Sequence, residues 1–92
     1  MTIQIKYTAQ LKKAAGTSEE IIDIPAEENL KQLLQRLARH HSPRFAEMLF
    51  NEQGQFLNTT VLVLNDQQVR LEDKVGLKEN DQLLLLSPIA GG

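Results

Sequence analysis

The sequence predicts an α+β fold in which a mixed β-sheet carries one main helix packed on one face. Polar and apolar residues alternate near the N-terminus, as they do in strands with one buried face. A later segment spaces its apolar residues as an amphipathic helix does, and two further short runs are apolar throughout, which is typical of buried strands. With 92 residues, 41% of them hydrophobic, the chain is long enough for one domain with a folded core.

The N-terminal part of the chain predicts two paired strands. Polar and apolar residues alternate over 2–8, and we expect this strand to continue to Leu11. The segment 12–17, which contains Gly16, is then expected to form a turn. A second strand is predicted at 20–24, and a short connection between the two strands favours an antiparallel hairpin.

The segment after Asn29 carries the strongest helical signal in the chain. Its apolar residues recur with helical spacing and form a single stripe: Leu30, Leu33, Leu34, Leu37 and Ala38. Asn29 is a favourable N-cap, and Gln32 stands where the second residue of a capping box belongs. Pro43 is expected to end this helix because proline cannot continue the hydrogen-bond ladder.

The rest of the chain predicts less regular structure between two strands. Residues 42–58 are expected to be irregular apart from one short helical turn within 45–50. A strand is predicted at 60–64, followed by an irregular crossover that ends at Asn80, the residue best suited there to a left-handed conformation. The final strand is predicted at 82–87.

Both of these C-terminal strands carry apolar residues on both of their faces. A helix on one side of the sheet buries only one face and leaves the other face open. We expect four residues to point inward: Leu62, Leu64, Leu83 and Leu85. We expect the alternate residues to point outward and to form a surface that we call the partner face: Val61, Val63, Leu84 and Leu86. An exposed apolar patch of this kind indicates a protein-binding site, and the alternative is that the crossover folds over it.

The last five residues form a predicted tail, separate from the domain at 1–87. The tail, 88–92, has no ionisable side chain and consists of Pro88, Ile89, Ala90, Gly91 and Gly92. Proline lacks a backbone N–H, so the last strand should end at Ser87. The two glycines lack a Cβ and suit a narrow channel, and the reactive group would be the Gly92 carboxylate. The alternative is an ordinary frayed chain end.

Composition excludes several kinds of site. The chain has no cysteine, so disulfides, zinc–thiolate sites, iron–sulfur clusters and cysteine nucleophiles are excluded. We expect no metal site, because His40 and His41 have no further histidine or cysteine to complete one. The isolated glycines form no phosphate-binding loop, and no Ser/His/Asp ordering is present, so we expect no catalytic side chain.

Charge and hydropathy also limit the partners. The formal net charge is −2 with both signs mixed along the chain, which argues against nucleic-acid binding. No stretch approaches the roughly 20 apolar residues that span a membrane, and the N-terminus lacks the apolar run of a signal peptide. We therefore expect a cytoplasmic protein that binds neither nucleic acid nor membrane.

The order of elements with a terminal Gly-Gly resembles the β-grasp, ubiquitin-like sulfur carriers, most closely the small subunit of molybdopterin synthase and its MoaD/ThiS-like relatives. Five segments carry the likeness: 7–16, the helix from Asn29, 63–66, 75–81 and 86–92. The chain departs from the family pattern at Asn80, where glycine is common, and at 51–58, which is similar to carriers that serve cysteine synthesis.

The resemblance implies a function that resides in the tail. A ubiquitin-activating-type adenylyltransferase would use ATP to adenylate Gly92, and sulfur would then replace AMP to leave a thiocarboxylate. Gly91 would be the slim neighbour, and 88–90 would set the reach of the tail. The chain itself would bind no cofactor. It would donate sulfur as part of a sulfurtransferase, to a molybdopterin synthase large subunit or to another sulfur acceptor.

Three classes of function are therefore open. The chain is either a sulfur carrier, or a ubiquitin-like modifier attached to lysines, or an interaction module with an incidental tail. If it is a carrier, the sulfur could serve molybdopterin, thiamine, cysteine or tRNA thiolation.

Overall fold

The structure is a computed structural model, and it describes residues 1–87. Over these residues five strands form one sheet: β1 (Thr2–Tyr7), β2 (Glu19–Asp23), β3 (Val61–Leu64), β4 (Gln67–Val69) and β5 (Asp81–Leu86). Their order in the sheet is β2-β1-β5-β3-β4, with β1 and β5 parallel at the centre and the other neighbours antiparallel. The predicted mixed sheet is thus confirmed.

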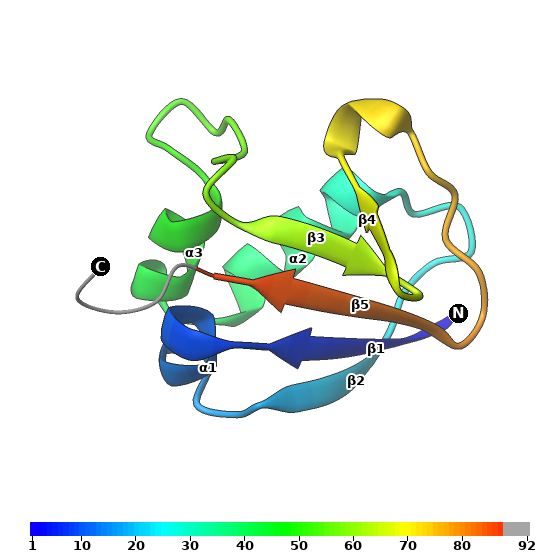
Figure 1. The fold of residues 1–92 in the computed structure, drawn as a ribbon, viewed down its shortest axis with the longest axis horizontal. Coiled ribbons are helices and arrows are strands. Elements are labelled where there is room, and N and C mark those ends of the chain that lie inside the picture. Colours follow the sequence, from blue (N-terminus) through cyan, green and yellow to red (C-terminus); the bar gives the residue numbers. More distant parts are fainter. Residues whose placement is uncertain (88–92) are drawn as a thin grey trace.

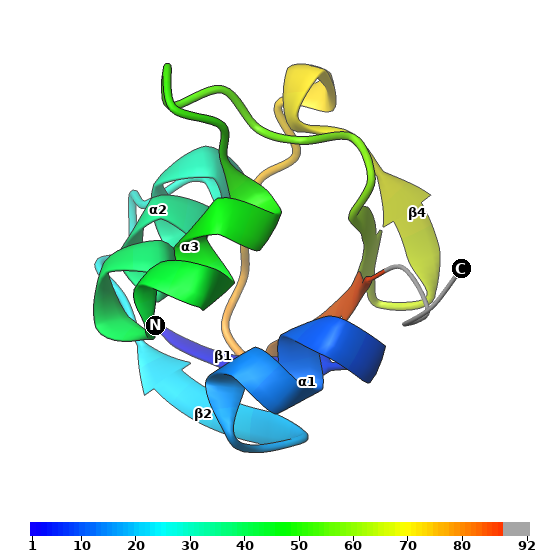
Figure 2. The same cartoon turned by 90° about the vertical axis from the view of Figure 1, so that its left-hand side faces the viewer.

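The helices cover one face of this sheet and one of its ends. They are α1 (Ala9–Ala15), α2 (Leu30–His40), α3 (Pro43–Leu49) and the short 3₁₀ helix η1 (Leu71–Asp73). Figure 2 shows the sheet curving around α2 and α3, and Figure 1 shows α1 at the end where β1 and β5 finish. The sheet and helices enclose one core, in which Phe45, Leu33 and Leu83 are fully buried.

The connection between the first two strands differs from the prediction. β1 and β2 pair antiparallel as expected, with Ile5 opposite Glu20. Residues 9–15 form α1, however, instead of extending a strand and starting a turn. Alanine, lysine and leucine are strong helix formers, and Gly16 ends the helix in a left-handed conformation with φ 77°.

The helix predicted after Asn29 is confirmed together with its cap. The Asn29 side chain accepts a hydrogen bond from the Gln32 backbone N–H at 2.8 Å, and the Asn29 backbone N–H donates to the Gln32 side chain at 2.9 Å. Pro43 also begins a helix of its own. Pro43 occupies the first turn of α3, and Ser42 caps that helix. Where a single helical turn was predicted within 45–50, the structure therefore has a seven-residue helix.

The crossover contains a strand that the prediction missed. β4 pairs antiparallel with β3 through a two-residue turn at Asn65 and Asp66, whose φ angles are 50° and 70°. Positive φ at both central residues is the geometry of the turns that join neighbouring strands tightly. The left-handed conformation expected at Asn80 is confirmed, with φ 67°. β5 begins at Asp81 and ends at Leu86, within one residue of the prediction.

Candidate functional site

The candidate site is the surface around Ser87, at the end of β5, from which the predicted tail continues in the sequence. The tail residues Pro88, Ile89, Ala90, Gly91 and Gly92 lie outside the described residues. The roles expected for them stay predictions. What the structure shows is how residue 87 is fixed and which side chains surround the end of β5.

Ser87 is tied to the junction between β1 and α1 by three hydrogen bonds. Its backbone N–H donates to Thr8 Oγ1 at 3.1 Å, and its hydroxyl donates to the Thr8 carbonyl oxygen at 2.5 Å. The Leu11 backbone N–H in turn donates to Ser87 Oγ at 3.2 Å. Thr8 Oγ1 also donates to the carbonyl oxygen of Leu85 at 3.1 Å.

Ser87 therefore does for α1 what an N-cap side chain normally does. Thr8 stands at the N-cap position, but its side chain makes no cap hydrogen bond because it is bonded to β5 instead. The N–H of Leu11 is one of the groups left unpaired at a helix start, and Ser87 accepts from it. Sequence reasoning missed this role, and no local pattern links residues 8 and 87.

The two faces of β3 and β5 are as predicted. The four leucines expected inward are all buried: Leu62, Leu64, Leu83 and Leu85. On the outward side, Val61, Val63 and Leu84 are half-buried and Leu86 is 36% exposed. In the register of the sheet, Val61 lies opposite Leu86 and Val63 lies opposite Leu84. The partner face is therefore one continuous patch of two cross-strand pairs.

The crossover does not account for the burial of the partner face. Its apolar residues pack against the buried core instead: Val69, Leu71, Val75 and Leu77. The core lies between the sheet and the helices, whereas the partner face is formed by the opposite parity of β3 and β5. β3 and β5 are both interior strands of the sheet, so Val61, Val63 and Leu84 lie on strands that have a neighbour on each side.

Polar and charged groups border the partner face. Lys6 on β1 is exposed and pairs with Leu84, while Gln68 on β4 pairs with Val63 on the other side. A hollow of about 360 Å³ adjoins Val61, and Arg70 is among the residues that line it. An apolar centre with a polar rim that carries cations is the usual composition of a protein interface.

The two histidines lie at another place, at the end of α2. His40 is exposed, His41 is half-buried, and both approach Glu20 of β2. Glu20 is 20 residues before His40 in the chain, so no local pattern of histidines and cysteines indicates this carboxylate, which the fold brings beside them.

The helices within residues 1–87 include none with the length and apolar character that a membrane span requires.

Comparison with known proteins places this geometry in context. The chain matches the ThiS family over residues 5–92. A molybdopterin synthase sulfur carrier subunit from Chlamydomonas reinhardtii is 27% identical over 92 residues, covering 100% of both chains.

Solved structures show the same fold. SAMP1, a small archaeal modifier protein from Haloferax volcanii, aligns with a TM-score of 0.87 and 22% identity, covering 100% of both chains. A chain in the complex of subunits 1 and 2 of the molybdopterin-converting factor from Helicobacter pylori aligns with a TM-score of 0.62 and 22% identity, again over 100% of both chains.

The family match extends over nearly the whole domain and through residue 92, and the mixed five-stranded sheet of residues 1–87 agrees with the solved structures. The chain therefore belongs to the ThiS family and has the ubiquitin-like β-grasp fold.

Proposed function

We propose that this protein is a sulfur carrier whose terminal glycine is converted to a thiocarboxylate, and that it serves as the small subunit of a molybdopterin synthase. The observation that carries the proposal is the continuous apolar partner face on β3 and β5, directly beside the anchored residue from which the tail continues. The relative from Chlamydomonas, named a molybdopterin synthase sulfur carrier subunit, supports the choice of pathway.

The chemistry follows from the weakness of a carboxylate as an acyl donor. A carboxylate is anionic and resonance-stabilised, so a nucleophile cannot displace its oxygen directly. In the proposed reaction a separate adenylyltransferase joins the Gly92 carboxylate to the AMP part of ATP and releases pyrophosphate. A sulfur donor then displaces AMP and leaves the thiocarboxylate. The carrier itself supplies no catalytic side chain and binds no ATP.

The folded domain contributes positioning. The partner face would dock on the adenylyltransferase and then on the sulfur acceptor, so that each enzyme receives the tail from a fixed starting point. Holding a reacting group in the correct geometry in this way is worth roughly 7–11 kcal/mol in well-oriented systems. The complex of subunits 1 and 2 in the Helicobacter pylori structure supports a large subunit as the acceptor. We also expect the protein to act in the cytoplasm.

Intact-mass spectrometry tests the proposal. The protein is incubated with its adenylyltransferase, ATP and a sulfur donor, and we expect a mass increase equal to the difference between sulfur and oxygen. A variant that lacks Gly91 and Gly92 is the control and should not change. A carboxyl terminus that never exchanges oxygen for sulfur would exclude the carrier function.

Assays in the presence of target proteins and of candidate sulfur acceptors separate the alternative functions. A ladder of lysine conjugates on a blot would indicate a ubiquitin-like modifier. Sulfur transfer to a thiamine, cysteine or tRNA pathway in place of a molybdopterin precursor would keep the carrier function and change only its acceptor. Full function without the two glycines would indicate an interaction module.

A further inference from the structure

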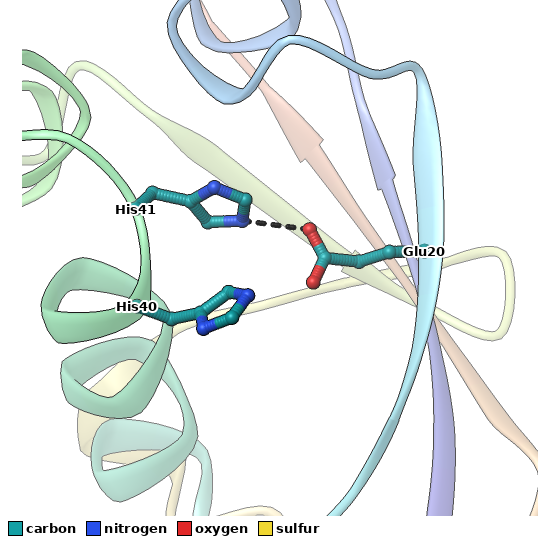
Figure 3. Close-up of side chains that lie close together, drawn as sticks. All are labelled: Glu20, His40 and His41. Atoms are coloured by element: carbon teal, nitrogen blue, oxygen red, sulfur yellow. Dashed lines mark hydrogen bonds and ion pairs between the residues drawn. The ribbon is translucent and has the colours of Figure 1, made fainter.

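We propose that Glu20, His40 and His41 form a site for a divalent transition-metal ion, best suited to Zn²⁺, that joins the edge strand β2 to the end of α2. One candidate ligand atom from each of the three residues lies within 4.8 Å of the others. Figure 3 shows both imidazole rings turned toward the carboxylate across the gap between helix and strand.

The departure of the chain from α2 brings the two histidines together. Neighbouring residues within a helix point in different directions, but His40 is the last helical residue and His41 has extended backbone angles, φ −94° and ψ −173°. The chain therefore turns out of the helix between them. The two rings consequently lie with their centroids 5.0 Å apart, although they are adjacent in sequence.

Glu20 and His41 are already in place. His41 Nε2 lies 2.6 Å from Glu20 Oε2, and the side chains are only 12% and 18% exposed. The Tyr7 hydroxyl donates to the same carboxylate oxygen at 2.9 Å. This hydrogen bond from Tyr7 holds the Glu20 carboxylate in its orientation toward the histidines. A group that orients a ligand in this way is typical of metal sites.

The ligand set and its surroundings favour a cation of the zinc type. Two imidazoles and one carboxylate suit zinc and its neighbours in the first transition row better than magnesium or calcium, which prefer oxygen ligands. Ligand atoms around a tetrahedral zinc lie roughly 3.3 Å apart, because zinc–nitrogen distances are about 2.0–2.1 Å. To reach this spacing, His41 Nε2 and Glu20 Oε2 would exchange their 2.6 Å hydrogen bond for bonds to the ion and move about 0.7 Å apart, and the exposed His40 ring would rotate toward the ion. The negative end of the α2 dipole also favours a cation here.

The expected effect of the ion is structural. Among the described strands β2 lies at the edge and pairs with β1 alone, and a shared ion would reinforce the link that Glu20 and His41 already make between β2 and the end of α2. Three protein ligands leave the fourth position of a tetrahedral ion open to water. The proposed zinc site uses neither the tail nor a partner. A failure to bind zinc would therefore leave the proposed function unaffected, and a failure of sulfur transfer would leave the zinc site unaffected.

Calorimetric titration of the full chain with Zn²⁺ alone tests the site. We expect one zinc per chain, with His40→Asn and Glu20→Gln each weakening binding by at least about tenfold. Glu19→Gln is the matched control, because it removes a carboxylate from the same strand on the opposite, exposed side. Zinc at a hundredfold excess over its dissociation constant should raise the unfolding temperature of the wild type by roughly 10–20 °C, and that of His40→Asn by much less.

Nuclear magnetic resonance separates a true site from scattered surface binding. Zinc should shift the ring nitrogen signals of both histidines together in the wild type. An absence of zinc binding, an equal affinity in the wild type and His40→Asn, or a shift of only one ring would overturn the proposal.

Discussion

Ser87 shows how one hydroxyl group connects three elements. It receives a hydrogen bond from α1 and donates one to the end of β1, while it belongs itself to the end of β5. A buried or half-buried group with two such bonds is costly to remove because its former partners lose their hydrogen bonds. The residue that precedes the tail is thus fixed by the domain, so the tail begins at a defined place.

Substitution of this residue is our first prediction. Ser87→Ala should lower the free energy of unfolding by about 1–2 kcal/mol, the usual cost of losing a helix cap and a side-chain hydrogen bond. Urea denaturation measures the loss, and hydrogen exchange at the Leu11 amide should become faster. Ser18→Ala, at an exposed position, is the control and should change stability by less than about 0.5 kcal/mol. Equal stability of the two variants would contradict the role assigned to Ser87.

Glu28 and Arg36 form a second local link, between the loop before α2 and the helix itself. Arg36 Nε and Nη2 donate to the two carboxylate oxygens of Glu28 at 2.9 and 2.7 Å. The hydrogen bonds from Arg36 and its positive charge lower the pKa of Glu28 below the ordinary glutamate value. The Arg36 side chain is 40% exposed, so solvent screens part of this attraction.

A pH dependence of stability follows from this pair. Because the pKa of Glu28 is lower in the folded protein, the pair stabilises the fold above the unfolded glutamate value of about 4.3 and stops doing so as the pH falls through the lower folded value. The difference in unfolding temperature between wild type and Glu28→Gln should therefore be constant near neutrality and shrink below about pH 4. Glu27→Gln, at an exposed neighbouring position, should show no such trend. A difference that persists at low pH would argue against the pair.

At the scale of elements, β3 and β5 divide their side chains between the buried core and the partner face, for which we propose a role in binding. One parity of each strand is buried against the helices, and the other forms the partner face. Both strands are short, and their apolar outward residues stand in two adjacent cross-strand pairs. Neighbouring residues of one strand should therefore respond to mutation in opposite ways.

Leu85 and Leu86 provide a matched test of this division. Leu86→Asp should weaken binding to the proposed large subunit more than tenfold, because a charge without a counterion would enter the apolar partner face, and it should leave the domain folded. Leu85→Ala should instead lower the free energy of unfolding by about 2–5 kcal/mol, since Leu85 is fully buried. Calorimetric binding and urea denaturation measure the two effects. Unfolding of Leu86→Asp would show that this residue belongs to the core.

At the scale of the whole molecule, we expect folding and the proposed chemistry to depend on different residues. Among the described residues 1–87, the buried core lies between the sheet and the helices. The proposed reacting group belongs to Gly92, outside that core in the sequence. Changes at the tail should consequently affect sulfur transfer without affecting stability.

Extension of the chain tests this separation. One alanine added after Gly92 should abolish thiocarboxylate formation, because the carboxyl group would then stand on a residue with a Cβ and one position farther from the domain. The unfolding temperature should stay the same. Mass spectrometry after the activation reaction and thermal denaturation report the two properties. Normal thiocarboxylate formation by the extended chain would refute the requirement for a terminal glycine.

Local sequence was enough to predict the features that depend on neighbours along the chain. The spacing of leucines after Asn29 predicted α2, and Asn29 with Gln32 predicted its cap. Within the apolar runs at 61–64 and 83–86, the two-residue period of a strand separated the buried leucines from their outward neighbours. These patterns are readable because helix and strand impose fixed periods on residues that are close in sequence. The positive φ of Asn80 belongs to the same class.

Long-range contacts decided the rest. The segment 9–15 could have continued a strand. It forms α1 in the fold, where Ser87 at the end of β5 accepts a hydrogen bond from the N–H of Leu11 at the start of the helix, 76 residues away in the chain. β4 is a strand because β3 offers it an unpaired edge, and Glu20 meets the two histidines because β2 lies beside the end of α2. Composition and periodicity record only which residues are neighbours in the chain. The tertiary structure alone determines which groups far apart in the chain come within hydrogen-bond distance of one another.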